Sequence, residues 1–191
     1  MNPKFIKCPP QYVAQFLTPE AIRKFAKDPE NDMTEEFVTE ALWKGDECFG
    51  ILDGGALAAY SWYSSKPTRI RPKALCINVD EHYVYMYKGF THEKYRGQRL
   101  HAIGKTIALQ AYIAKGLQGM ISYVEFDDSD SLKSTRRMGA RHFGSIYIVG
   151  AFGHYVVHRT RGCRKLGVHV ERFQAPPDAP SLDASRPLEA E

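Results

Sequence analysis

The sequence lacks the features that mark several special classes of protein. No apolar run reaches the roughly 20 residues that a bilayer-spanning helix requires. The first residues, Met1 to Lys4, do not resemble the apolar core and cleavage site of a signal peptide. We therefore expect a cytoplasmic protein without a transmembrane segment.

Cysteine is scarce. The chain has no Cys-x-x-Cys pair and only four cysteines, at Cys8, Cys48, Cys76 and Cys163. This pattern argues against a zinc ribbon, a thioredoxin-type redox site and a disulfide scaffold. His154 and His158 would lie about 13 Å apart on a strand, too far to share one ion. We expect four unpaired thiols, most of them in the core, and no metal.

The remaining composition is that of a globular protein. The chain has 191 residues, of which 43% are hydrophobic and 25% charged, which suits one domain with its own core. From residue 175 the sequence is rich in Pro, Ala and acidic residues and has no periodicity. We expect a single domain over residues 1–174 and a disordered tail over 175–191.

Charge is unevenly distributed along the chain. Nine acidic residues and one lysine lie between Asp28 and Asp53. Between Ser131 and Val170 there is no acidic residue, and eight residues are basic: Lys133, Arg136, Arg137, Arg141, Arg159, Arg161, Arg164 and Lys165. The basic segment is either a solvated face or a site for a phosphorylated ligand or an acidic partner.

Local patterns predict helices and strands in alternation. Expected helices follow Thr18-Pro19, open at Asp32 with Phe37, Leu42 and Trp43 inward, start near Gly97, and follow Asp128. The segments before Pro19 and from Ser64 to Lys73 read as irregular. Expected strands are 48–52, 56–63, 81–91, 120–126, 141–149, 154–159 and 166–173, with a hairpin at Asp53-Gly54-Gly55. This order indicates an α/β or α+β protein with a mixed sheet.

One segment combines a strand, a short Arg-Gly loop and an amphipathic helix. It runs from Tyr87 to His101 and includes Arg96-Gly97 directly before the helix. The first N–H groups of a helix lack partners, and the helix dipole adds positive charge there. Gly97 allows close backbone approach, so this segment suits a phosphate or pyrophosphate.

The segment resembles the acyl-CoA-binding motif Arg/Gln-x-x-Gly-x-Gly/Ala of the GCN5-related N-acetyltransferase (GNAT) superfamily. Residues 128–140 resemble the second signature of that family, and the likeness spans about residues 12–160. The resemblance implies a mixed, mostly antiparallel central sheet with helices on both faces and two splayed parallel central strands. These strands would be 81–91 and 120–126.

Both signatures depart from the family pattern. Arg99 and His101 replace small residues. Their bulk would either narrow the pyrophosphate-binding site, or Arg99 would add a cation to that site. Asp128 stands in place of the usual Asn, and Thr135 in place of a Tyr that often protonates the leaving thiolate. Ser134 or a Tyr from elsewhere would then serve, or the thiolate leaves without help.

The resemblance implies an acyl-CoA-dependent N-acyltransferase, most simply an N-acetyltransferase that uses acetyl-CoA. The residues that it places at the CoA are Phe90, Thr91, Arg96, Gly97, Gln98, Arg99, Leu100, His101, Asp128 and Ser131. An alkyl amine must lose a proton before it attacks. Catalytic candidates are Glu81, Tyr83 and Glu125, with His82 as a further candidate base. The tyrosines Tyr83, Tyr85 and Tyr87 either belong to the core or line the acyl or acceptor pocket.

Several alternatives stay open at this point. The donor could be an acidic acyl carrier protein that docks on the basic segment, or the chain could be a non-catalytic GNAT-like binding module. The acceptor is a small-molecule or peptide amine, and a homodimer is compatible with the sequence. No recognised motif supports a nucleic-acid partner.

Overall fold

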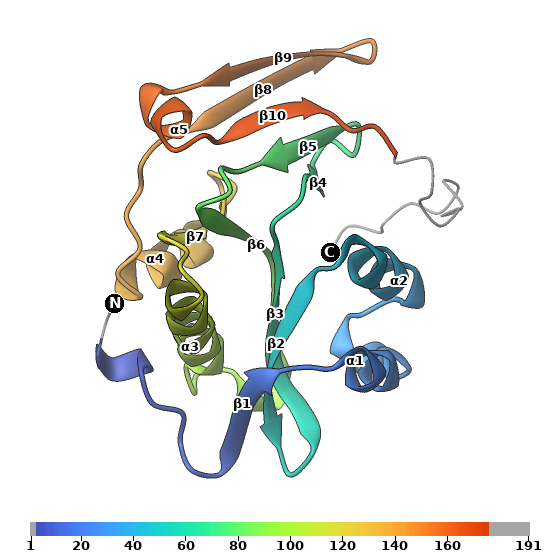
Figure 1. Cartoon of the computed structure of the whole chain (residues 1–191), viewed down its shortest axis with the longest axis vertical. Coiled ribbons are helices and arrows are strands. Elements are labelled where there is room, and N and C mark those ends of the chain that lie inside the picture. The colour runs from blue at the N-terminus through green and yellow to red at the C-terminus, as the bar shows by residue number, and fades with distance from the viewer. Residues whose placement is uncertain (1–2, 176–191) are drawn as a thin grey trace.

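The computed structural model describes residues 3–175, and its centre is a five-stranded sheet (Figure 1). The strands are ordered β1-β2-β3-β6-β7. Their bounds are β1 Tyr12–Phe16, β2 Glu47–Asp53, β3 Ala56–Ser64, β6 Tyr83–Thr91 and β7 Gly119–Ile121. All neighbouring pairs are antiparallel except β6 and β7, which are parallel.

Helices cover both faces of this sheet (Figure 1). Helices α1 (Pro19–Ala26) and α2 (Glu35–Lys44) pack on one face, where Ile22, Val38 and Trp62 form the core. Helix α3 (Leu100–Ala114) packs on the other face, and α4 (Ser129–Arg137) lies beside it. The sheet is therefore buried on two sides, as its nearly continuous apolar strands require.

Two smaller sheets lie beyond the end of the central sheet (Figure 1). One is ordered β10-β5-β4, with β4 Thr68–Ile70, β5 Leu75–Asn78 and β10 His169–Arg172. The other is the hairpin of β8 (Ile146–Ala151) and β9 (His154–Arg159), which α5 (Arg161–Lys165) follows. Short 3-10 helices are η1 Pro3–Phe5, η2 Pro29–Asn31 and η3 Glu93–Tyr95.

Several local predictions are confirmed. The Thr18 hydroxyl caps α1, Gly45 ends α2 with φ 82°, and Asp128 caps α4. The turn after Asp53 joins β2 and β3 as an antiparallel hairpin. The mixed, mostly antiparallel sheet with helices on both faces is also confirmed.

Other local predictions are wrong. The segments read as irregular contain β1 and β4, and β5 and α5 were not predicted. Strand β1 has only five residues and follows two prolines, and the β4–β5 hairpin is equally short, so their periodicity is weak. Helix α2 begins at Glu35, and Trp43 is 42% exposed instead of inward.

Three further observations bear on the remaining sequence predictions. Cys48, Cys76 and Cys163 are buried and Cys8 is half-buried, and all four are unpaired. None of the helices within residues 3–175 is long and apolar enough to cross a membrane. The tail predicted to be disordered lies, from residue 176, outside the described residues, and the single-domain extent stays a prediction.

Candidate functional site

Strands β6 and β7 are parallel neighbours over three residues each, and we call the point where this pairing ends the fork. Their parallel pairing ends at Tyr85 and Ile121, whereas β6 continues to Thr91 with β3 as its partner. The register of the β3–β6 pair also shifts next to Trp62 and Tyr63, which marks a bulge in β6 near Tyr87. The two strands are parallel neighbours as predicted, and beyond Tyr85 this edge of β6 has no strand partner among the described residues.

The first turn of α3 presents unpaired backbone donors. The helix begins at Leu100, three residues later than predicted, and Arg99 before it has φ 63° and ψ 17° without a side-chain cap. Gly97 also has a positive φ, of 79°. Within residues 3–175, the N–H groups of residues 100–102 have no acceptor. Such a turn followed by a helix start forms a concave, partly positive anion site.

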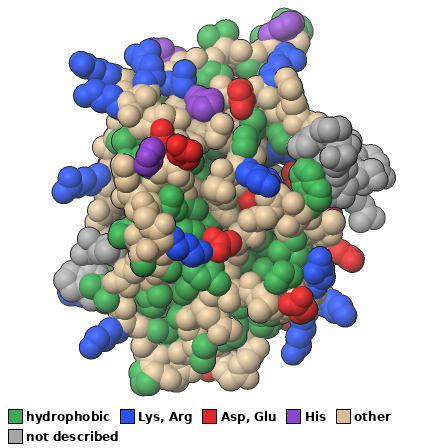
Figure 2. Space-filling model, viewed as in Figure 1, with side chains coloured by type: hydrophobic (Ala, Val, Ile, Leu, Met, Phe, Trp, Pro, Cys, Tyr) green, Lys and Arg blue, Asp and Glu red, His purple; other side chains and the backbone are tan. Residues whose placement is uncertain are grey.

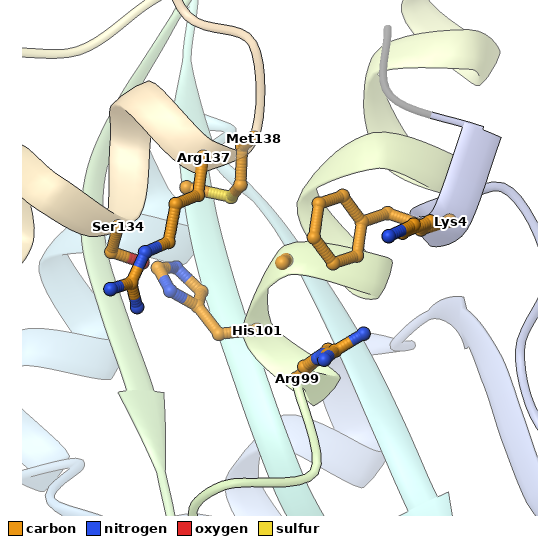
Figure 3. Close-up of a pocket in the computed structure, with 8 residues that line it drawn as sticks. Lys4, Arg99, His101, Ser134, Arg137 and Met138 are labelled. Carbon is orange, nitrogen blue, oxygen red and sulfur yellow. The ribbon is translucent and has the colours of Figure 1, made fainter.

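Cationic side chains surround this helix start. A cavity of about 460 Å³ lies between η1, the first turn of α3 and the last turn of α4 (Figure 3). No carboxylate of the described residues lines it; its lining is Lys4, Phe5, Arg99, His101, Ala102, Ser134, Arg137 and Met138. Arg96 lies outside this set and forms an exposed ion pair with Glu93 at 3.1 Å, which contributes little to stability.

His101 packs against Gly89 on β6. A Cβ at Gly89 would lie 2.6 Å from His101 Nε2, so the glycine makes room for the ring. Burial lowers the pKa of His101 to about 4, which keeps the ring neutral, and its buried Nε2 has no partner within residues 3–175. His101, which stands where the family pattern has a small residue, therefore fits because residue 89 is a glycine without a side chain.

Lys105 lies one helical turn beyond His101 and reaches the base of the fork. Its Nζ donates to Ser122 Oγ at 3.2 Å, and Ser122 is the residue directly after β7. Burial lowers the pKa of Lys105 to about 8. No carboxylate of the described residues pairs with it.

The second signature forms the start of α4. The Asp128 carboxylate accepts the Ser131 N–H at 2.9 Å, and this bond lowers the pKa of Asp128. Both residues lie at the end of α4 opposite the cavity, which Ser134 and Arg137 line instead. The Thr135 hydroxyl donates to the backbone of the preceding turn, at 2.9 Å from Ser131 O.

The three catalytic candidates are not brought together. Glu81 lies in the turn before β6, and Glu125 is exposed in the loop after β7, because that strand ends at Ile121 instead of Phe126. Tyr83 begins β6, and its hydroxyl donates to Gln118 Oε1 at 3.3 Å. His82 pairs with Asp80 in an exposed turn, which raises the pKa of the imidazole.

Among the predicted CoA contacts, the structure groups the loop and helix start: Gly97, Gln98, Arg99, Leu100 and His101 are consecutive, and Phe90 and Thr91 end the adjoining β6. Phe90 itself stacks on Tyr60 on the α2 face, with ring centroids 5.5 Å apart. Only its backbone is therefore directed to the open edge.

Sequence reasoning missed Lys105 and Ser122, and it left Tyr85 undecided. Tyr85 is 1% exposed and belongs to the last parallel pair of β6 and β7, and its hydroxyl has no partner within residues 3–175. The only sequence signal for Lys105 is a charged residue between buried positions of an otherwise apolar helix.

A second buried polar cluster lies on the opposite, α2 face of β6. The Asp46 carboxylate accepts from Tyr87 Oη at 2.8 Å and pairs with Lys44 Nζ at 3.0 Å. Lys44 also donates to Thr68 Oγ1 at 2.9 Å. This cluster has a partner for each of its charges.

Comparison with known proteins identifies the fold. The chain matches no family model and no curated protein. It is similar to the structure of aminoglycoside N-acetyltransferase AAC(6')-Iy in complex with CoA, at 11% identity and a TM-score of 0.57 over 76% of this chain and 99% of that one. It is also similar to aminoglycoside acetyltransferase meta-AAC0020 from an uncultured soil metagenomic sample, at 13% identity and a TM-score of 0.54 over 76% and 97%.

A third similar structure is ribosomal-protein-alanine N-acetyltransferase from Brucella melitensis, at 11% identity and a TM-score of 0.51 over 73% of this chain and 99% of that one. The chain thus has the GNAT fold over nearly the whole length of these enzymes. At these identities the likeness defines the fold, which confirms at that level the resemblance drawn from the two signatures.

Proposed function

We propose that the protein is an acyl-CoA-dependent N-acyltransferase. The observation that carries this proposal is the junction of the open edge of β6 with the uncapped start of α3. The pyrophosphate of CoA would accept from the N–H groups of residues 100–102, and Arg99 and Arg137 supply positive charge on the adjoining cavity. The pantetheine arm would follow the edge of β6 into the fork.

The residues present fit such a donor. A dianionic pyrophosphate needs donors without competing carboxylates, and the cavity lining supplies cations and no acid among the described residues. An extended pantetheine amide chain can pair with exposed strand groups as an added strand would. His101 does not obstruct this edge, because its ring lies over Gly89.

The reaction in this site is direct acyl transfer. A neutral amine attacks the thioester carbonyl carbon, and the C–S bond breaks as the thiolate leaves. A backbone N–H on the open edge of β6 would polarise the carbonyl. Tyr83, Glu81 and Glu125 remain the candidates for handling the amine proton, directly or through water.

Thiol release with a panel of acyl-CoAs tests the proposal. The purified chain would be incubated with acetyl-CoA and longer acyl-CoAs together with aminoglycosides or peptides with a free N-terminus. Acceptor-dependent thiol release that Gly97→Val reduces and Gly116→Val preserves would support it. Tight binding of CoA without turnover for any acceptor would favour the non-catalytic module.

An acyl carrier protein is a second candidate donor, because α5 presents basic side chains to solvent. Arg161, Arg164 and Lys165 are exposed on this helix. Lys and Arg side chains gather at the corner of the molecule where α5 lies (Figure 2). Carrier proteins are acidic, so docking there would be strongly salt-sensitive. Acyl transfer from a carrier protein that exceeds transfer from acyl-CoA would establish this alternative.

A further inference from the structure

Lys105 has no carboxylate partner among the described residues that would explain its position. It lies on α3 among buried residues, including Thr106 and Ala108, and its side chain is turned toward the sheet. Burying an ammonium without a countercharge costs free energy, and the single hydroxyl of Ser122 offsets only part of that cost. A buried charge that is not neutralised within the protein is a candidate partner for a ligand charge.

The position of Lys105 is defined by the fork. Ser122 follows Ile121, the last residue of β7 that pairs with β6, so the Lys105 ammonium lies where the pairing of the two strands ends. His101, the other titratable group that faces it from α3, is neutral at pH 7 because its pKa is lowered to about 4. The residues of β6 that pack on α3, Val84 and Met86, are apolar.

The usual proton donor of such a reaction is absent from the second signature. Thr135 occupies that position, and its hydroxyl is bonded to the backbone of α4 at 2.9 and 3.0 Å. A hydroxyl that is committed to two carbonyl groups is poorly placed to serve a departing sulfur. The leaving thiolate would therefore enter the fork as an anion without a donor from α4.

We propose that Lys105 is the catalytic residue that stabilises and protonates the leaving thiolate. The inference rests on the proposed acyltransferase function. As the amine nitrogen bonds to the carbonyl carbon, the C–S bond breaks and its electron pair stays on sulfur. The Lys105 ammonium gives a proton to sulfur, the amine gives up its own proton to water, and Lys105 is then reprotonated from solvent. Ser122 acts as a positioning residue that holds Nζ at the base of the fork.

The chemistry of the two groups is well matched. Burial lowers the pKa of Lys105 to about 8, close to that of an alkyl thiol, so proton transfer between them is nearly balanced. At pH 7 the ammonium form still predominates, which is the form that a proton donor needs.

The ionisation of bound CoA tests the proposal without any acceptor. The ultraviolet absorbance of the CoA thiolate would be titrated against pH in the presence of excess protein, with S-methyl-CoA as the blank. A cation close to the thiol should lower its pKa by about one unit or more relative to CoA in solution. Lys105→Met should return the pKa to its solution value, whereas Lys105→Arg should keep it low because the charge is retained.

The outcomes separate the two proposals. If CoA binds equally to the wild type and Lys105→Met with the same thiol pKa, the role of Lys105 is overturned and the acyltransferase function is unaffected. If the folded wild type binds no CoA, both proposals fail. Lys105→Met removes a half-buried charge that has no carboxylate partner among the described residues, so circular dichroism should show a folded variant. Ile113→Ala on the exposed side of α3 serves as a matched control.

Discussion

The two faces of β6 carry buried polar clusters that differ in one respect. On the α2 face, Asp46 pairs with Lys44 and with the Tyr87 hydroxyl, so charge and hydrogen-bonding capacity are met within the protein. On the α3 face, Lys105 and His101 are half-buried without a carboxylate partner among the described residues. A complete cluster stabilises the fold, whereas an incomplete one is a candidate for completion by a ligand.

The same contrast appears along the chain. The complete cluster joins α2, β4 and β6, and it ties the small β10-β5-β4 sheet to the central sheet through Lys44 and Thr68. The incomplete cluster lies beside the uncapped start of α3 and the open edge of β6. We expect mutations in the first to affect stability and mutations in the second to affect binding.

The largest expected effect is at Asp46. Its carboxylate is 1% exposed, so Asp46→Asn leaves the Lys44 ammonium buried without its countercharge. We expect the free energy of unfolding to fall by about 3 kcal/mol. Urea denaturation followed by circular dichroism measures this change. Glu47→Gln is the matched control: it breaks the exposed ion pair with Lys115 and should cost less than about 1 kcal/mol. Equal losses in both variants would contradict the comparison.

His101 should make stability depend on acid pH. Its pKa is about 4 in the folded protein and about 6.5 when unfolded, so the unfolded chain binds more protons between these values. Stability therefore falls as pH decreases through this window, by up to about 3 kcal/mol. His101→Gln should remove this component of the pH dependence. Curves of stability against pH that stay parallel for wild type and variant from pH 7 to pH 4 would show that His101 is not held neutral by burial.

Lys105→Met should act in the opposite direction to Asp46→Asn. The folded pKa of Lys105 is about 8, below the unfolded value of about 10.4, so the unfolded chain binds more protons between them. The side chain thus destabilises the protein at pH 7, and this loss is relieved as pH rises toward 10. We expect Lys105→Met to raise the free energy of unfolding by about 2 kcal/mol at pH 7 and by little at pH 10. A destabilised variant at pH 7 would show that Lys105 is structural.

Gly97 should affect binding more than folding. Its φ of 79° is unfavourable for a β-branched residue, and a Cβ there would meet open space. Gly97→Val should distort the turn that aligns the first N–H groups of α3 and weaken CoA binding about tenfold or more in calorimetry. Gly116→Val is the control, because Gly116 has a similar φ of 97° at the other end of α3. Equal CoA affinities in the two variants would argue against the proposed pyrophosphate site at the start of α3.

The smallest expected effect on CoA binding is at α5. The double variant Arg161→Glu and Arg164→Glu should change CoA affinity by less than about threefold, because exposed charges beyond a Debye length of about 8 Å are screened. It should slow association with an acidic donor or acceptor at low salt. Unchanged turnover with a carrier-protein donor at low salt would show that the basic residues of α5 are only solvated and do not bind a partner.

The sequence allowed the fold class and the α3 loop to be predicted because these depend on local signals. Thr18, Asp128 and Gly45 are capping residues whose role is set by their neighbours in the chain. Strand β1 could not be predicted, since its pairing with β2 is a tertiary contact between short segments.

The site was predicted less completely for a similar reason. Gly97 and Arg99 are visible as a motif, whereas the contact between His101 and Gly89 joins a helix to a strand. In the sequence, Lys105 looks like an ordinary helical lysine. Its contact with Ser122 joins α3 to the residue after β7, so only the folded structure shows it. Asp128 and Ser131 have the right spacing for the second signature. In the structure the Asp128 carboxylate accepts from the Ser131 N–H, at the end of α4 opposite the cavity.

We propose that acyl-CoA binds where the open edge of β6 meets the start of α3. Titration of the isotopically labelled protein with CoA, followed through its backbone amide resonances, tests it most directly. We predict the largest shifts at residues 89–91 and 97–102, with smaller shifts at Ser122. Shifts confined to α5 or to the α2 face, or no shifts at saturating CoA, would contradict this binding site.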